Sequence, residues 1–390
     1  MLKQLGKFGI IGLLIATGLV YLKFLATHSY YPTDYVAFLA ASRVLMVSPH
    51  QLYDYSAQLI SQLQLVPDDP AISPTPLIPF ANPPTFLIFF LPFSKLPPAL
   101  AYKIMIILNL GVLVIILRKL TELFPVKSTF QRLLVLALAC SFAPVYNTIV
   151  QVQSSLVTLL IIIYVYASLR SQKWWLAGLV SSTLFYKPQL GIVLWLYLLL
   201  SVNRQVIWGL LVGGLGWLAI SWLMAGNWVS SWISAIRLFS TYDNTSLPSL
   251  VSWVGLWHQL LKVWPGLPAD TIAYIFSLLT LLTSGLMLSK ISIKSKLLPQ
   301  AFSIIIMTTL LSVIHVHYQE VVMLIFILFS NHTQLHLRKV QILVALGWLI
   351  YLLAIFSPWY PASLPILPTI YLVVLWIVIM IKGVRPISNA

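Results

Sequence analysis

Apolar runs separated by short polar stretches account for most of this 390-residue chain. They fall near residues 8–27, 99–117, 132–149, 155–169, 174–186, 189–202, 206–225, 271–289, 299–314, 318–330, 340–357 and 363–381. Several are shorter than the roughly 20 residues that an isolated transmembrane helix needs. Short helices still span where neighbours satisfy the backbone or the bilayer thins. The pattern therefore predicts an all-α polytopic membrane protein, residues 1–390 forming one domain of about twelve transmembrane helices.

Two stretches near the N-terminus need separate interpretation. The run at 85–93 is short and lies between Pro83-Pro84 and Pro97-Pro98, which predicts a re-entrant or interfacial hairpin. Residues 1–7 are basic, like the start of a signal peptide. The apolar run that follows is long and has no A-x-A cleavage pattern near its end, so we interpret it as an anchor.

The polar stretches predict two long outer loops, at about 28–98 and 226–270. The mostly apolar segment 35–47 is predicted to be a helix lying in the membrane interface. Two further amphipathic helices are indicated by apolar residues at spacings of three and four. The first contains Leu52, Tyr55, Leu59, Leu63 and Val66, and the second contains Trp228, Val229, Trp232, Ile233, Ile236 and Phe239.

Composition and charge support the membrane assignment. The chain is 60% hydrophobic and only 8% charged, whereas soluble domains are about a quarter charged. The net charge of +15 resembles that of a nucleic-acid-binding protein. With both termini inside, however, most Lys and Arg residues lie in inner loops, as the positive-inside rule requires, so no nucleic acid is expected. Every acidic residue except Glu122 lies on the outer side, which points to chemistry at that face.

Asp34 is the first candidate residue, since it follows the first apolar run directly. It could be a helix N-cap, which favours Asp, or a general base at the edge of the hydrocarbon layer, and one role does not exclude the other. Asp54 also fits an N-cap. Lys187 lies at the outer end of an apolar run, where it either snorkels to the interface or binds a phosphate.

Further polar groups lie at other outer helix ends. Gln153 stands beside Ser154 and Ser155, so this cluster is either a helix cap or a sugar contact. The segment 315–320 contains His315, His317 and Glu320, which could contact phosphate or sugar, form structural hydrogen bonds, or ligate a metal. Asn244-Thr245-Ser246 fits a glycosylation acceptor or a substrate contact. The sequence contains no P-loop, GxGxxG, GxSxG or HExxH pattern, which counts against nucleotide-driven transport.

Several short motifs in order resemble glycosyltransferase family 87, which belongs to the GT-C superfamily. They cover about residues 30–330 and are Thr33-Asp34-Tyr35, Phe38 to Arg43, Tyr53-Asp54, Asn82-Pro83-Pro84, Leu91-Pro92, Leu96-Pro97-Pro98, Val152-Gln153-Ser154, Lys187-Pro188, Asn244-Thr245-Ser246 and the segment 315–320. Two positions differ from the family pattern, because Val152 stands where Gly is usual and Glu320 where Asp is usual.

The resemblance implies an inverting transferase that moves a hexose, commonly mannose, from a polyprenyl-phosphate donor to a lipid- or glycan-linked acceptor at the extracytoplasmic face. It implies that Asp34 is the catalytic base. The donor phosphate would meet Lys187, His315, His317 and Arg43, and sugar or acceptor would meet Gln153, Asn244, Tyr35, Asp54 and Glu320. We expect no cofactor, and a divalent metal is not expected.

Other functions remain open from the sequence. A polytopic transporter, a lipid-linked oligosaccharide flippase and an oligosaccharide ligase would also be multi-pass membrane proteins. Against transport, the apolar runs hold almost no ionisable residues at mid-span. For a bacterial host, which we assume, the protein would lie in the inner membrane among its lipids, with both termini in the cytoplasm and the active site outside.

Overall fold

The computed structural model describes residues 2–27, 32–65, 78–125, 128–243, 250–264, 266, 268–331, 347 and 366–383. Over these residues all regular secondary structure is helical, as the sequence predicts. The predicted run at 340–357 lies outside the described residues apart from Gly347, as do the pair Asp68-Asp69 and the tripeptide Asn244-Thr245-Ser246.

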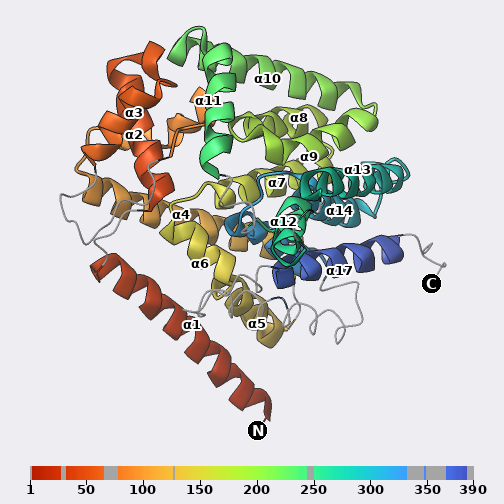
Figure 1. Ribbon diagram of the computed structural model, residues 1–390. Coiled ribbons are helices and arrows are strands. Elements are labelled where there is room, and N and C mark those ends of the chain that lie inside the picture. The colour runs from red at the N-terminus through yellow and green to blue at the C-terminus, as the bar shows by residue number, and fades with distance from the viewer. Residues whose placement is uncertain are drawn as a thin grey trace.

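Every other predicted apolar run is a helix, or a helix pair, in the structure. The helices are α1 (Leu2–Thr27), α4 (Pro98–Leu123), α5 (Thr129–Cys140), α6 (Ala143–Val150), α7 (Ser155–Arg170), α8 (Trp174–Ser182), α9 (Pro188–Leu200), α10 (Arg204–Ala225), α13 (Ala269–Leu288), α14 (Leu298–Ser312), α15 (Leu324–Asn331) and α17 (Ile366–Gly383). In Figure 1, α1 lies at the edge of the molecule, where it packs against α5 and its Tyr21 contacts Tyr146 of α6.

Few of these helices have the length of a full span. Among the described residues, α4, α10 and α13 are long and apolar enough to cross a membrane. The pair α5 and α6, bent by 47°, would make a fourth if it counts as one broken span. The predicted number of about twelve spans is therefore not confirmed, because most of the apolar runs form shorter helices.

The exposed faces of the long helices are apolar. On α10, Trp222 and Leu223 are exposed, and on α13 so are Leu278, Leu282 and Leu286. Apolar side chains that face outward along whole helices are typical of contact with lipid rather than water. The structure thus has the character of a membrane protein.

The first outer loop folds into α2 (Thr33–Val47), the short 3-10 helix η1 (Pro49–Gln51) and α3 (Tyr55–Leu63). The helix predicted at 35–47 exists, but residues 35–42 are buried on all sides and do not present one free apolar face. Small side chains at Ala37, Ala40 and Ala41 let α3 and the neighbouring 3-10 helices pack close against α2. The interfacial prediction for α2 is therefore corrected to a core helix.

Helix α3 has an unusual orientation for an amphipathic helix. Its polar residues Gln58, Ser61 and Gln62 are buried against the protein, while Ile60 and Leu63 are exposed. A water-soluble protein would place these faces the other way round. The predicted amphipathic helix is thus present, and an exposed apolar face of this kind is typical of a helix that meets lipid.

The stretch 85–93 neither spans nor forms a regular hairpin. It consists of two 3-10 helices, η2 (Pro84–Phe89) and η3 (Leu91–Phe93), whose residues Phe86 and Leu87 are fully buried. Pro92, inside the stretch, has no backbone N–H to donate and so prevents a continuous α-helix.

Helices α8 and α10 pack backbone to backbone. A Cβ atom added to Gly178 would lie 2.0 Å from the carbonyl oxygen of Val206, and one added to Gly209 would lie 2.1 Å from that of Trp175. Small residues at such contacts let membrane helices approach closely. Helix α8 continues directly into η4 (Thr183–Tyr186), so this contact also fixes the residue that follows η4, Lys187.

Candidate active site

A cavity of about 540 Å³ lies where the predicted outer ends of several helices meet. Its walls come from the start of α2, the segment 78–83, the starts of α7 and α9, α11 (Trp228–Asp243) and the segment 312–320 after α14. Six of the predicted site residues line it, namely Asp34, Gln153, Lys187, His315, His317 and Glu320. Residues that are up to 286 positions apart in the sequence are thus brought together.

Asp34 lies in the first turn of α2. The N-cap position is held by Pro32, and no side chain caps the helix there, so Asp34 is not the cap. Its Oδ2 instead accepts a hydrogen bond from Nε2 of Gln153. A carboxylate in a first turn is stabilised by the helix dipole. The side chain is half-buried and faces the cavity, which leaves it able to meet a ligand.

Gln153 is held by the way in which α6 ends. The N–H of Val152 donates to Ile149 and that of Gln153 to Thr148, which is the Schellman pattern. Val152 has a φ of 53°, a region that a β-branched residue enters at a cost of about 1–2 kcal/mol. Its side chain is buried, which offsets that cost. The amide that holds Asp34 therefore follows a strained backbone position, where the family pattern has Gly.

Lys187 lies between η4 and α9, and Pro188 is the first residue of α9. The Nζ atom of Lys187 is 2.7 Å from Oε1 of Glu320, and the side chains of Lys187 and Glu320 are 12% and 1% exposed. A lysine that snorkels would reach for the interface, whereas this one points into the cavity. The geometry favours the second sequence interpretation, a cation that can meet an anionic ligand.

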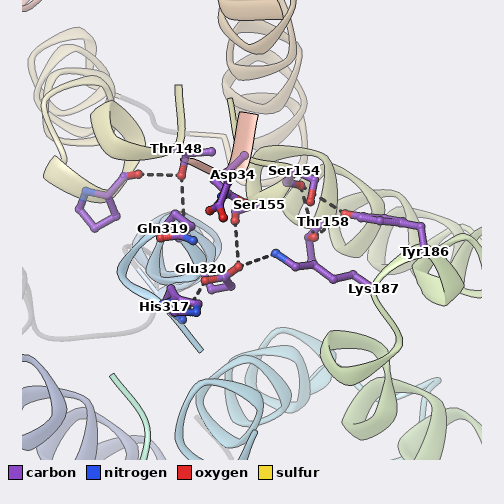
Figure 2. A network of polar contacts seen from close by, with 12 residues as sticks. Asp34, Thr148, Ser154, Ser155, Thr158, Tyr186, Lys187, His317, Gln319 and Glu320 are labelled. Atoms are coloured by element: carbon purple, nitrogen blue, oxygen red, sulfur yellow. Dashed lines mark hydrogen bonds and ion pairs between the residues drawn. The ribbon is translucent and has the colours of Figure 1, made fainter. Parts of the chain in front are cut away.

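Glu320 is surrounded by donors, as Figure 2 shows. Its Oε2 accepts the backbone N–H of His317 at 3.0 Å, and its Oε1 is 3.4 Å from Oγ of Ser155. His317 and Glu320 do not share an α-helical face, because His317 immediately precedes the 3-10 helix η6 (Tyr318–Met323). Both carboxylate oxygens of Glu320 already have partners in the protein, so Glu320 is well placed to hold Lys187. The same bonds leave fewer acceptor positions for the predicted contact with sugar.

A second set of hydrogen bonds lies behind Lys187. Oη of Tyr186 is 2.6 Å from Oγ1 of Thr158 and donates to the carbonyl oxygen of Ser154 at 3.2 Å. Tyr186 is fully buried, and the rings of Phe86 and Phe89 pack against it. The sequence did not single out Tyr186 or Thr158, although a tyrosine directly before Lys187-Pro188 was a usable signal.

The segment 78–83 forms another wall, and four side chains hold its backbone. Gln58 accepts the N–H of Phe80 at 2.7 Å, and Gln62 donates to the carbonyl oxygen of Ile78 at 2.9 Å. Tyr53 donates to the carbonyl of residue 82 at 2.8 Å, and Trp232 to that of residue 81 at 2.9 Å. The buried polar face of α3 therefore has a purpose, which is to fix this wall.

Helix α11 closes the cavity with an apolar surface formed by Trp232, Ile236 and Phe239. The apolar face of the helix predicted there is only partly used, because Val229 and Ile233 are exposed and do not line the cavity. The ring of His315 packs against Phe239, with the ring centroids 6.1 Å apart, so a polar side chain meets this surface directly. The cavity is therefore lined by both apolar and polar side chains.

Three predicted site residues lie elsewhere. Arg43 donates to the carbonyl oxygens of Ser94 and Leu96 at 2.9 and 3.1 Å. Tyr35 is buried, and its hydroxyl donates to the carbonyl of Pro98 at 2.6 Å. Asp54 caps α3 by accepting two backbone N–H groups, as the alternative interpretation held. The remaining predicted site residue, Asn244, is outside the described residues.

The cavity also contains polar residues that the sequence interpretation did not assign. They are Asn82, Gln189, Ser312 and Gln319. Asn82 and Gln319 lie within two of the motifs, Gln189 follows a third, and Ser312 lies near the end of an apolar run, which is the signal that could have identified them. Over the described part of the chain, no group of three His, Cys, Asp or Glu side chains is close enough to hold a metal ion.

Comparison with known protein families gives a match to glycosyltransferase family 87 over residues 80–316. This covers more than half of the chain and includes Gln153, Lys187 and His315, while Asp34 and Glu320 lie outside it. No curated protein and no solved structure matched the chain. The extent of the family match is sufficient to assign the chain. The protein belongs to glycosyltransferase family 87 and is a glycosyltransferase.

Proposed function

We propose that the protein transfers a hexose, mannose by family resemblance, from a polyprenyl-phosphate donor to a lipid- or glycan-linked acceptor at the extracytoplasmic face. One observation carries this proposal, namely a cavity in which the carboxylate of Asp34 and the ammonium of Lys187 face the same space beside an apolar wall. The cation suits a donor phosphate, the apolar wall suits the lipid chain attached to it, and the carboxylate suits an acceptor hydroxyl.

In the proposed reaction, Asp34 takes the proton from the acceptor hydroxyl as its oxygen attacks the anomeric carbon. The new glycosidic bond forms on the face opposite the leaving group, so the anomeric configuration inverts. The bond between the anomeric carbon and the phosphate oxygen breaks, and polyprenyl phosphate leaves with that electron pair. Gln153 orients Asp34 through its hydrogen bond to Oδ2. A positioned base typically contributes 10²–10⁴-fold to the rate.

No general acid is required, because the phosphate is a good leaving group that departs as a stable anion without first being protonated. It needs charge stabilisation, which a fixed cation provides best when it is oriented before the reaction. Lys187 is such a cation, held by Glu320. His317, which lies beside Glu320, and His315, whose ring packs against Phe239, also line the cavity and can donate hydrogen bonds to phosphate oxygens.

The test is transfer of a labelled sugar from polyprenyl-phosphate mannose by the purified Asp34→Asn variant. We expect a loss of at least about 100-fold in rate. Asp54→Asn is a matched control, since Asn caps helices as well as Asp does and this residue lies away from the cavity. A rate of sugar transfer near that of wild type in the Asp34→Asn variant would show that Asp34 is not the catalytic base.

A second measurement tests the phosphate contact. Lys187→Ala should weaken binding of polyprenyl phosphate, because the cation that faces the cavity is lost. Unchanged donor affinity in this variant would show that the phosphate binds elsewhere. Transfer from a nucleotide sugar in place of the lipid donor would overturn the donor class while leaving the family assignment intact.

A further inference from the structure

A second cavity, of about 460 Å³, lies at the other end of the helix bundle. It is formed by the C-terminal ends of α4, α7 and α15, the start of α8, the loop between α13 and α14, and the start of α14. Ser155 begins α7 and contacts Glu320 of the candidate active site, and Arg170 ends the helix at this second cavity. With a rise of 1.5 Å per residue, these ends are about 23 Å apart, most of the thickness of a hydrocarbon core.

Three cationic side chains line this second cavity, namely Arg170, Lys294 and Lys296. Within the described part of the chain, no acidic side chain lines it. The Nζ of Lys294 lies 5.8 Å from the ring centroid of Trp174, which is a cation–π contact. Arg170 donates to the carbonyl oxygen of Leu123, so its guanidinium is held at the cavity wall.

The loop that carries both lysines is fixed by its own serines. The N–H of Lys294 donates to Oγ of Ser292 at 3.2 Å, and that of Leu297 to Oγ of Ser295 at 3.0 Å. Serine side chains of this kind stabilise turns. The two ammonium groups are therefore attached to an ordered backbone, which lowers the entropy that binding costs.

We propose that this basic cavity binds the phosphate of an anionic membrane lipid head group. Basic pockets between transmembrane helices on the cytoplasmic side are suited to such head groups. The depth fits as well, since Trp174 at the cavity is a residue type typical of the membrane interface. Apolar side chains of Leu169, Ile293 and Leu298 beside the cations suit the first carbons below a head group. The site is separate from the sugar-transfer cavity and does not depend on the proposed function.

The experiment is native mass spectrometry of the full chain in detergent, titrated with phosphatidylglycerol, phosphatidylcholine or soluble glycerol 3-phosphate. Wild type should bind the anionic lipid at least tenfold more tightly than the zwitterionic one. The double variant Lys294→Gln/Lys296→Gln should lose about twenty-five-fold in affinity, since each cation near a lipid surface contributes about fivefold.

The matched control is Lys173→Gln/Lys290→Gln, two exposed lysines at the same end of the molecule that do not line the cavity. This control should bind phosphatidylglycerol with an affinity within about twofold of wild type. That change is smaller than the loss of about fivefold expected for removing one cation that contacts the lipid. The proposed lipid site would be refuted if the Lys294→Gln/Lys296→Gln variant kept wild-type affinity for phosphatidylglycerol. It would also be refuted if the control variant lost as much affinity as this variant. If glycerol 3-phosphate bound as tightly as the lipid, the cavity would be a site for a free phosphate ester and the lipid assignment would fail. Thermal unfolding of each variant checks that it is folded.

Discussion

The buried pair of Lys187 and Glu320 allows a sharp test of how the candidate active site is built. The perturbation is a double-mutant cycle that compares the wild type with three variants, Lys187→Met, Glu320→Gln and the two together. Methionine keeps most of the length of lysine without its charge, and glutamine keeps the shape of glutamate. Each single variant leaves one ionised group without its partner, whereas the double variant leaves none.

The magnitude follows from the geometry. At 2.7 Å and an effective dielectric constant of 20, the attraction between the two charges is about 6 kcal/mol. Desolvation of the charges opposes it, so that removing one partner of a buried pair costs about 3–5 kcal/mol. Glu320 keeps its bond from the N–H of His317, so we expect about 3 kcal/mol for Lys187→Met. Glu320→Gln should cost about 2 kcal/mol, because Lys187 retains some solvent contact.

The double variant should cost no more than about 2 kcal/mol, because neither charge remains buried alone. The coupling between the two residues is then about 3 kcal/mol. The assay is thermal unfolding in one detergent under identical conditions. The expected order is that the double variant unfolds at or above the temperature of Lys187→Met. All three proteins should lose sugar transfer, which separates stability from function.

The exposed pair of Arg118 and Glu122 is the control. Their atoms approach to 3.2 Å, but their side chains are 83% and 47% exposed, so the matching cycle should give almost no coupling. If the Lys187 and Glu320 variants were instead additive, with the double variant unfolding at the sum of the two shifts, the pair would not be a structural unit. The assignment of Glu320 as the residue that positions Lys187 would then fail.

Three further predictions concern stability. Gln58→Ala should lower stability by about 1–3 kcal/mol by leaving a buried N–H unpaired, whereas Gln64→Ala on an exposed site of the same helix region should change it little, as thermal unfolding can show. Gln172→Gly should raise the unfolding temperature, because this exposed residue has a φ of 57° and glycine removes about 1 kcal/mol of backbone strain there. A lower unfolding temperature in this variant would contradict the prediction. Gly209→Ala should reduce the folded yield because its methyl group meets backbone, while Gly216→Ala, with open space around it, should be tolerated.

Helix positions were predictable because each apolar run has a length and composition that only a helix can satisfy in lipid. The number of spans was not, since run length does not say whether a helix crosses the bilayer or stops within the bundle. The burial of α2 was also missed. Its alanines suit an interfacial helix and a tightly packed core helix equally well, and only contacts with distant segments distinguish them.

The candidate site was partly predictable for a similar reason. Polar residues at the ends of apolar runs, such as Asp34, Gln153 and Lys187, lie at one side of the bundle by topology alone. Which of them meet depends on loop paths that leave no periodic signal. Arg43 illustrates the limit, because its charge suggested a phosphate contact while its guanidinium binds the carbonyl groups of residues 94 and 96.

The close contact between α8 and α10 has a consequence for the mutational tolerance of this enzyme. Gly178 and Gly209 do not line the candidate active site, yet any side chain there would push apart the two helices that set the position of Lys187. In a saturation mutagenesis screen for transfer activity, these glycines should therefore be as intolerant as the cavity residues. A map of intolerant positions would show two separate clusters, and only the one at the cavity would mark chemistry.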